Sequence, residues 1–185
     1  NLHASLLPAY RGAAPIQRAM MGGETVTGVS VIALAQTMDA GTVYATAECA
    51  IDPLETAGEL HDRLATLGPA AVSAVLADLE AGTLRPVEQD HARATRAPKL
   101  RKDEGTVDFD QPAEGVRARV HGLAPWPGCR VSVTPAGGSV AEGEPLTLCR
   151  VADVPEDDVG RGGGRSPRPR PGMLLTGYRV ATASP

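Results

Sequence analysis

The first 90 residues alternate between apolar patterns typical of strands and of helices. Residues 28–35 (GVSVIALA) are apolar on both alternating faces and rich in β-branched side chains, which predicts a strand covered on both sides. Residues 43–51 (VYATAECAI) alternate well enough to predict a further strand. Ahead of both, Pro15 suits the first turn of a short helix that the glycines at 22 and 23 would end.

A longer helical pattern follows these strands. Thr56 and Glu59 form a capping-box pair, and the leucines after them recur at helical spacing. Gly68-Pro69 is expected to interrupt this helix, after which a second apolar stripe stops at Gly82. Strands followed by helices in this order predict a layered α/β domain over residues 1–90.

The pattern changes twice in the second half of the chain. Residues 91–111 lose apolar content and gain basic side chains, which predicts either a solvated linker or a surface that contacts phosphate. Residues 112–123 have a helical stripe, and the short alternating runs beyond Trp126 predict a small β-barrel or sandwich over 112–185. Residues 156–172 are rich in Gly, Pro and Arg, so we expect a disordered insertion there.

Composition and charge exclude several classes of protein. The 42% hydrophobic content argues against wholesale disorder, and a net charge of −4 argues against a basic field over the whole molecule. The three scattered cysteines predict neither a metal site nor a disulfide framework, and we interpret them as reduced thiols of a cytoplasmic protein. We see no membrane span or signal peptide, and a first residue other than Met suggests a piece of a longer chain.

Three side chains offer chemistry. Asn1 and His3 share one side of an extended segment, and Asp39 lies in a turn beyond the predicted buried strand. An amide can stabilise a developing oxyanion, an imidazole can exchange a proton, and a carboxylate can orient the imidazole and offset positive charge. These groups fit acyl or formyl transfer to an amine, although an Asn-x-His segment and an Asp before Ala-Gly are also common in turns and polar cores.

The residues around this trio resemble those of the folate-dependent formyltransferases. NLHASLLPAYRGAAPIQRAMMGGETVTGVSV followed by MDAGTVY is similar to their Asn-x-His-x-Ser-Leu-Leu-Pro segment and its distant Asp-x-Gly. The likeness continues through APKLRKDEGTVDF and LAPWPG into the β-rich tail, so it covers almost the whole chain. It implies the C-terminal half of a Rossmann-like catalytic domain, a basic linker and an OB-like barrel, without the N-terminal part of the catalytic domain.

The resemblance also implies an activity. Within the family, the chain is most similar to enzymes that transfer the formyl group of 10-formyltetrahydrofolate to the α-amine of methionyl initiator tRNA, in translation initiation. We then expect Asn1, His3 and Asp39 to be catalytic, no metal, no membrane partner, a monomer, and a fragment that is inactive alone. The residues expected to bind folate are Ser5, Leu6, Leu7 and Pro8. The candidates for contact with tRNA are Arg11, Arg96, Lys99, Arg101, Lys102, Arg117 and Arg119.

Several alternatives stay open at this point. Arg11 fits substrate contact and a structural ion pair equally well, and Trp126 fits packing at a domain entrance or stacking on a base. The amine acceptor could instead be a nucleotide-sugar or another small amine. A noncatalytic RNA-binding module is the alternative from another class, although an aromatic content of 3% is low for base stacking.

Overall fold

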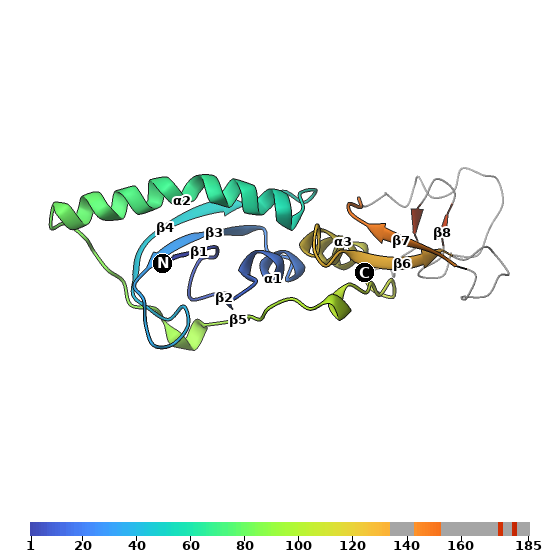
Figure 1. Cartoon of the computed structure of the whole chain (residues 1–185), viewed down its shortest axis with the longest axis horizontal. Helices are drawn as coiled ribbons and strands as arrows, with labels where there is room; N and C mark the ends of the chain where they lie inside the picture. Colours follow the sequence, from blue (N-terminus) through green and yellow to red (C-terminus); the bar gives the residue numbers. More distant parts are fainter. Residues whose placement is uncertain (134–142, 153–173, 176–178, 181–185) are drawn as a thin grey trace.

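A computed structural model describes residues 1–133 and 143–152, together with the backbone of residues 174–175 and 179–180 (Figure 1). In the first 50 residues one short helix lies between two pairs of consecutive strands, one long helix follows, and the described C-terminal elements are mainly strands. The elements are β1 (Leu2–His3), β2 (Arg11–Gly12), α1 (Pro15–Met21), β3 (Val26–Ile32), β4 (Val43–Ala50), α2 (Ala57–Glu80), the 3-10 helix η1 (His91–Arg93), β5 (Arg96–Ala97), the 3-10 helix η2 (Lys102–Glu104), α3 (Ala113–Gly122), β6 (Cys129–Val133), β7 (Glu144–Leu148), β8 (Leu174–Leu175) and β9 (Arg179–Val180).

The site is built on a three-stranded antiparallel sheet in the order β1-β3-β4. All residues of β3 except the first are buried, which confirms the prediction of a strand covered on both sides. The predicted strand at 43–51 is also confirmed, as β4. Because β1 pairs with β3 through Leu2 opposite Val31 and His3 opposite Ser30, the sheet fixes the position of the His3 side chain.

Helix α2 lies along this sheet and covers β3 and β4 (Figure 1). Its first turn has the predicted capping box, with the Thr56 hydroxyl accepting from Glu59 N and the Glu59 carboxylate accepting from Thr56 N. Leu60 and Leu64 pack into a core with Val29 of the sheet. Burying a leucine of this kind contributes about 1.5–3 kcal/mol to stability.

The predicted interruption of this helix at Gly68-Pro69 is wrong, because α2 runs through both residues to Glu80. Gly68 is buried, and a side chain there would collide with Leu2 of β1. The glycine therefore provides room for the edge of the sheet. Pro69 lacks the N–H that would bond four residues back, but the helix contacts β3 and β4, which offset this loss.

The short helix α1 confirms the prediction made from Pro15 and Gly22, and it joins two apolar cores. Ile16 and Met20 pack into the core beneath α2, whereas Met21 packs against the second core around α3. Gly122 of α3 lies so close to Met21 that a side chain there would collide with it. Helix α1 is thus held in place by packing on two sides.

The basic segment 91–111 lies against the first 90 residues of the chain (Figure 1). Its strand β5 pairs in parallel with β2, and Ala97 and Leu100 are buried, with Leu100 in the core around α3. Arg96, Lys99 and the basic residues that follow are exposed. The boundaries of the predicted linker stay a prediction, but the segment has a fixed path across the surface.

The C-terminal part begins with α3, which confirms the helix predicted at 112–123. Strands β6 and β7 form an antiparallel pair, as do β8 and β9. Among the described residues these pairs are separate two-stranded sheets, so closure into an OB-like barrel stays a prediction. The insertion predicted at 156–172 lies outside the described residues.

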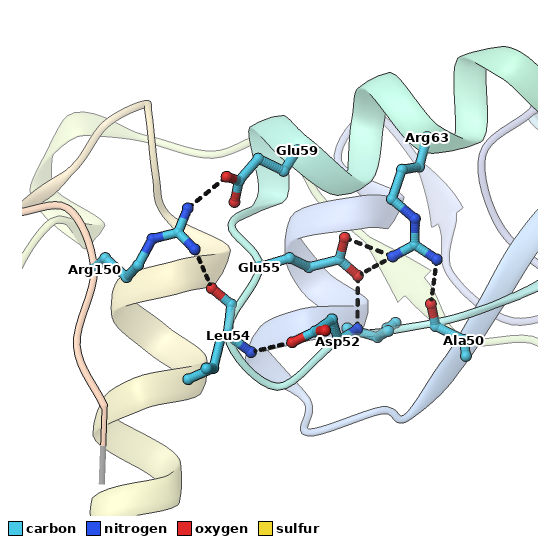
Figure 2. A pocket seen from close by; sticks show the side chains of 8 residues that line it. Ala50, Asp52, Leu54, Glu55, Glu59, Arg63 and Arg150 are labelled. Carbon is cyan, nitrogen blue, oxygen red and sulfur yellow. Dashed lines mark hydrogen bonds and ion pairs between the residues drawn. The ribbon is translucent and has the colours of Figure 1, made fainter.

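Arg150, which follows β7, joins this part to the first turn of α2 (Figure 2). Its guanidinium donates to the Glu59 carboxylate (2.5 Å) and to the Leu54 carbonyl (2.7 Å). Next to it, Val151 N donates to Nε2 of the buried His121 of α3 at 3.1 Å. These bonds connect three segments that are far apart in the sequence.

A cavity of about 540 Å³ lies beside Arg150. Its charged side chains all have partners: Arg63 donates to both oxygens of the buried Glu55, Arg150 donates to Glu59, and Asp52 accepts from Leu54 N (Figure 2). Since these charges are already satisfied, we assign the cavity to packing between parts of the chain rather than to catalysis.

Candidate active site

His3 is buried and its two ring nitrogens face different groups. Nε2 lies 3.0 Å from the carbonyl oxygen of Tyr10, and Nδ1 lies 3.7 Å from Oδ2 of Asp39. Because a carbonyl can only accept, Nε2 must hold a proton. In the neutral ring, Nδ1 is then an unprotonated acceptor that points toward Asp39. The distance to Asp39 is too long for a direct hydrogen bond but suits a bridging water or a reacting group.

A hydrogen bond holds the Asp39 carboxylate in place, and the backbone of Asp39 has an uncommon conformation. Oδ2 accepts a hydrogen bond from Gly12 N at 2.8 Å, and the residue has a positive φ of 54°. Such a conformation costs an L-residue roughly 1–2 kcal/mol and is tolerated best by Asn and Asp. The turn that follows the buried strand thus brings the carboxylate to His3, as the sequence predicted.

Gly12 is the third partner in this geometry. Its φ is +130°, and a side chain there would collide with the Ala97 carbonyl of β5. Only glycine allows β2 to approach β5 this closely while its N–H points at Asp39. The backbone of segment 91–111 therefore takes part in shaping the site.

Asn1 is exposed, and its backbone continues the ladder between β1 and β3. Its nitrogen donates to the Ile32 carbonyl and its carbonyl accepts from Ile32 N, both at 2.8 Å. Asn1 and His3 occupy alternate positions of an extended segment, so their side chains extend from the same side of it. The two hydrogen bonds hold the first residue in place.

The Ser5-Leu6-Leu7-Pro8 loop is fixed by the hydroxyl of Ser30 in β3. Ser30 Oγ donates to the Ser5 carbonyl at 2.7 Å and accepts from Leu7 N at 3.1 Å. Ser5 is completely buried and Leu7 nearly so, whereas Leu6 and Pro8 are partly exposed. The surface that this loop offers to a ligand thus consists of Leu6, Pro8 and the peptide groups.

Gln89 connects the Asp39 turn to Arg11, and nothing in its sequence surroundings had singled it out. Its Nε2 donates to the carbonyls of Asp39 (2.8 Å) and Gly41 (2.7 Å). Its Oε1 accepts from Nε and Nη2 of Arg11 at 3.0 and 2.5 Å. Arg11 Nη2 also lies 2.9 Å from Nδ1 of His91, so the side chains that contact Arg11 are an amide and an imidazole rather than the carboxylate of the ion pair considered above.

A cavity of about 590 Å³ opens beside Gly12. Its walls come from β2, from residues 37–38 next to Asp39, and from segment 91–99. The basic side chains that line it are Arg11, Arg96 and Lys99, together with His91. No carboxylate is among the lining residues, so the cavity suits an anionic group placed next to the trio.

The other predicted tRNA contacts are distributed differently. Arg119 donates from Nε to the Thr106 carbonyl and from Nη2 to the Glu104 carbonyl, both at 2.5 Å, so it braces the turn before α3. Arg101 forms an exposed pair with Asp103 at 3.0 Å, and Lys102 is exposed. Arg117 lies in the middle of α3. Trp126 is 49% exposed, so neither packing nor contact with a base is decided by its burial.

The family models match both parts of the chain. The model described as Formyl transferase matches residues 1–76, and the model described as Formyl transferase, C-terminal domain, matches residues 99–177. The chain belongs to the formyltransferase family. The first match covers the trio, the loop at 5–8 and the sheet beneath them, so the family resemblance seen in the sequence is confirmed.

The curated proteins similar to this formyltransferase chain include methionyl-tRNA formyltransferases of several bacteria. It is 49% identical over 127 residues to the methionyl-tRNA formyltransferase of Nitratidesulfovibrio vulgaris, covering 69% of the chain and 38% of the relative. It is 43% identical over 152 residues to that of Solibacter usitatus, covering 82% and 49%. The chain thus spans between about two fifths and one half of the length of these relatives.

Solved structures share the fold of this formyltransferase chain. An N-formyltransferase from Helicobacter canadensis, in complex with folinic acid and dTDP-3-aminofucose, matches with a TM-score of 0.63 at 16% identity. The match covers 66% of this chain and 46% of that protein. At this identity the comparison establishes the formyltransferase fold and leaves the acceptor open.

The described residues contain neither a cluster of potential metal ligands nor a helix suited to crossing a membrane. In residues 1–133 and 143–152, no group of three or more His, Cys, Asp and Glu side chains is placed to hold a metal ion. Over the part of the chain that the structure describes, no helix is long and apolar enough to cross a membrane.

Proposed function

We propose that this chain contains the catalytic trio of a methionyl-tRNA formyltransferase, which transfers the formyl group of 10-formyltetrahydrofolate to the α-amine of methionyl initiator tRNA. The main support is the position of Asp39, with Oδ2 3.7 Å from His3 Nδ1 and 2.8 Å from Gly12 N. The methionyl-tRNA formyltransferases that are 43–49% identical to the chain favour this acceptor.

The reaction needs an oxyanion donor and a proton acceptor. The amine nitrogen attacks the formyl carbon, the carbonyl oxygen becomes negative and the nitrogen becomes positive. We assign the Asn1 amide as the donor to this oxygen, because Nε2–H of His3 is already bonded to the Tyr10 carbonyl. His3 Nδ1 takes the amine proton, and the nearby Asp39 carboxylate stabilises the resulting imidazolium. The bond between the formyl carbon and N10 of the folate then breaks, and the His3 imidazolium returns this proton to N10.

The binding surfaces follow the same assignment. Leu6, Pro8 and the peptide groups of the fixed loop contact the folate, while the buried Ser5 and Leu7 maintain the loop. Arg11, Arg96 and Lys99 receive phosphates of the tRNA acceptor end in the cavity beside Gly12. Arg101, Lys102, Arg117 and Arg119 remain candidates for contacts farther along the tRNA, next to the predicted barrel. A monomer in the cytoplasm also remains a prediction.

Asp39→Asn tests the catalytic assignment. The assay measures formyl transfer from 10-formyltetrahydrofolate to methionyl-tRNA, with the chain as it stands and with the chain extended before Asn1 over the part of its relatives that it does not cover. We expect the substitution to lower kcat by about 10²–10⁴-fold in the active form. Glu88→Gln is the control, because Glu88 is exposed and bonds Thr42 rather than the trio. An unchanged rate in Asp39→Asn would overturn the assignment.

The choice of acceptor has its own test. A dTDP-amino sugar replaces methionyl-tRNA, because the structurally similar Helicobacter canadensis protein was solved with such a compound. Transfer to the sugar and none to methionyl-tRNA would establish the alternative acceptor. Binding of tRNA without any transfer, unaffected by Asp39→Asn, would instead support the noncatalytic RNA-binding module.

The phosphate contacts are tested by salt dependence. Arg96→Ala combined with Lys99→Ala should weaken binding of methionyl-tRNA and reduce the slope of log affinity against log salt by roughly one for each lost contact. Arg85→Ala is the matched control, since Arg85 is exposed and donates to the carbonyls of Thr83 and Leu84 in its own turn. An unchanged slope in the double variant would exclude these two contacts.

A further inference from the structure

We infer that Gln89 is a positioning residue for Asp39: its side-chain amide fixes the turn that presents the carboxylate to Gly12 and His3. This inference rests on the proposed function for its consequence in catalysis, whereas the positioning itself can be measured without any reaction. The side chain is 7% exposed and lies 50 residues from Asp39 in the sequence.

Every hydrogen-bonding group of this amide is used. Both N–H groups donate, one to the Asp39 carbonyl and one to the Gly41 carbonyl, and Oε1 accepts twice from Arg11. A primary amide has two donors and one oxygen with two lone pairs, so no capacity is left over. A buried amide with all its bonds made fixes its neighbours to one another, because separating them would leave a buried polar group unpaired.

The bonds to Asp39 come from two directions. Gln89 holds the carbonyl, and Gly12 N holds the carboxylate, with the residue between them at a φ of 54°. An uncommon backbone conformation persists only where the surroundings fix it. Removing the Gln89 bond would let residue 39 relax toward ordinary φ values, and the carboxylate would move away from Gly12.

Gln89 is itself held in place by the preceding residues. Val87 and Val43 exchange two backbone hydrogen bonds of 2.8 Å, which join this segment to the start of β4. Thr42 Oγ1 also donates to the Glu88 carboxylate at 2.7 Å. The Gln89 amide is therefore held against the Asp39 turn by the same sheet that carries His3. The positions of Asp39 and His3 thus depend on one sheet.

The test is hydrogen exchange of the Gly12 amide, followed by NMR in the chain as it stands. This N–H is protected only while the Asp39 carboxylate is in position. We expect its exchange to become about tenfold faster in Gln89→Leu, which removes the whole network, because one lost hydrogen bond corresponds to roughly that factor. The adjacent variant Glu88→Gln keeps an oxygen that can accept from Thr42 Oγ1, so it should leave Gly12 exchange within about twofold of the wild type.

Two further variants separate the two ends of the amide. Gln89→Glu keeps an acceptor for Arg11 but loses both donors to the turn, so Gly12 exchange should accelerate as in Gln89→Leu. Arg11→Met removes the opposite end and should change Gly12 exchange by less than about threefold. If Arg11→Met has as large an effect as Gln89→Leu, the protection depends on Arg11 and the inference is wrong.

The amides of β3 and β4 report whether each variant keeps its fold. Unchanged Gly12 exchange in both Gln89 variants, with β3 and β4 protected, would overturn the inference. So would loss of β3 and β4 protection in both, because Gln89 would then support the whole sheet. If β3 and β4 lose protection in Gln89→Leu alone, the rate of Gly12 exchange in Gln89→Glu decides the outcome by the same criterion.

Transfer kinetics in the N-terminally extended protein connect the positioning to catalysis. Gln89→Leu should lower kcat by about 10–100-fold and change the KM for the folate by less than about twofold. Combined with Asp39→Asn, it should lower the rate little further, because both changes remove the same contribution. If the wild type transfers no formyl group, the proposed function fails while the exchange result still stands.

Discussion

Arg18 and Glu104 meet in a two-bond ion pair, with Nη1 2.6 Å from Oε2 and Nη2 3.0 Å from Oε1. Each side chain is only 20% exposed. The pair joins α1 to η2, which lies in the basic segment 91–111. Neither residue stood out in the sequence, because an exposed-looking arginine on a short helix and a glutamate in a charged run give no sign that they meet.

Arg18→Met should lower the free energy of unfolding by about 1–3 kcal/mol, because Glu104 loses its charged partner in a partly buried place. Urea unfolding measures the loss. Arg101→Met is the matched control: its pair with Asp103 is 74% and 68% exposed, so the loss should be below about 1 kcal/mol. Equal losses in the two variants would show that burial of the Arg18 pair has no special weight.

Glu59 should make stability depend on pH in the acidic range. The hydrogen bond from Thr56 N and then the bond from Arg150 lower the pKa of Glu59 from 4.5 to about 2. A lowered carboxyl pKa gives stability that is present above pH 4.5 and is lost as the pH falls toward 2.

Unfolding in urea at several pH values, for the wild type and Glu59→Gln, measures this contribution. The variant should show a shallower decline below pH 4.5, because its side chain does not titrate. Asp62→Asn is the control, since Asp62 is exposed and pairs with the neighbouring His61. Parallel pH profiles for the wild type and Glu59→Gln would contradict the prediction.

His121 should add a second dependence at higher pH. Burial lowers the pKa of His121 below its ordinary value of 6.5, and Nε2 must be unprotonated to accept from Val151 N. The unfolded chain therefore binds more protons just below pH 6.5, so this contribution is complete above that value and declines as the pH falls.

His121→Gln should remove the decline below pH 6.5, measured by urea unfolding, while keeping an acceptor within the side chain. His61→Gln should leave the decline in place, because the His61 side chain is 66% exposed. Amide exchange at Val151 gives a local measurement: it should accelerate as His121 is protonated. A decline that persists in His121→Gln would assign it to another group.

Leu60 and Leu76 should respond very differently to truncation although both lie on α2. Leu60 is fully buried in the core with Val29, so Leu60→Ala should cost about 2–5 kcal/mol in the free energy of unfolding. Leu76 is 54% exposed, and Leu76→Ala should cost less than about 1 kcal/mol. Chemical unfolding of the two variants measures both values, and similar losses would contradict the burial of α2 described above.

Most helices and strands could be predicted from local sequence patterns. Features that depend on contacts between distant residues could not. The Thr56 capping box and the apolar stretch of β3 were predicted because their signals lie within a few residues. Gly68 was misread as a helix break because its reason for being glycine is Leu2, which is 66 positions away in the sequence. A pattern along the chain shows that a glycine is present but not which neighbour requires it.

The same division applies to the site. The resemblance identified His3 and Asp39, and the turn after β3 brings them together. Gln89, the Gly12 amide and the Tyr10 carbonyl escaped prediction, because two of these partners are backbone groups and the third is one glutamine between charged residues. Hydrogen bonds of this kind depend on the folded arrangement, whereas candidate catalytic side chains can be recognised from residue type and motif.

Glu59 has two tasks in this fold. One carboxylate oxygen accepts from Thr56 N and so completes the first turn of α2, while the other accepts from Arg150, 91 positions later. Unwinding that first turn would remove the bond from Arg150, which adds to the core between α1 and α3 in joining the two parts of the chain. The two parts should unfold in a single cooperative transition rather than one after the other, although they match separate family models.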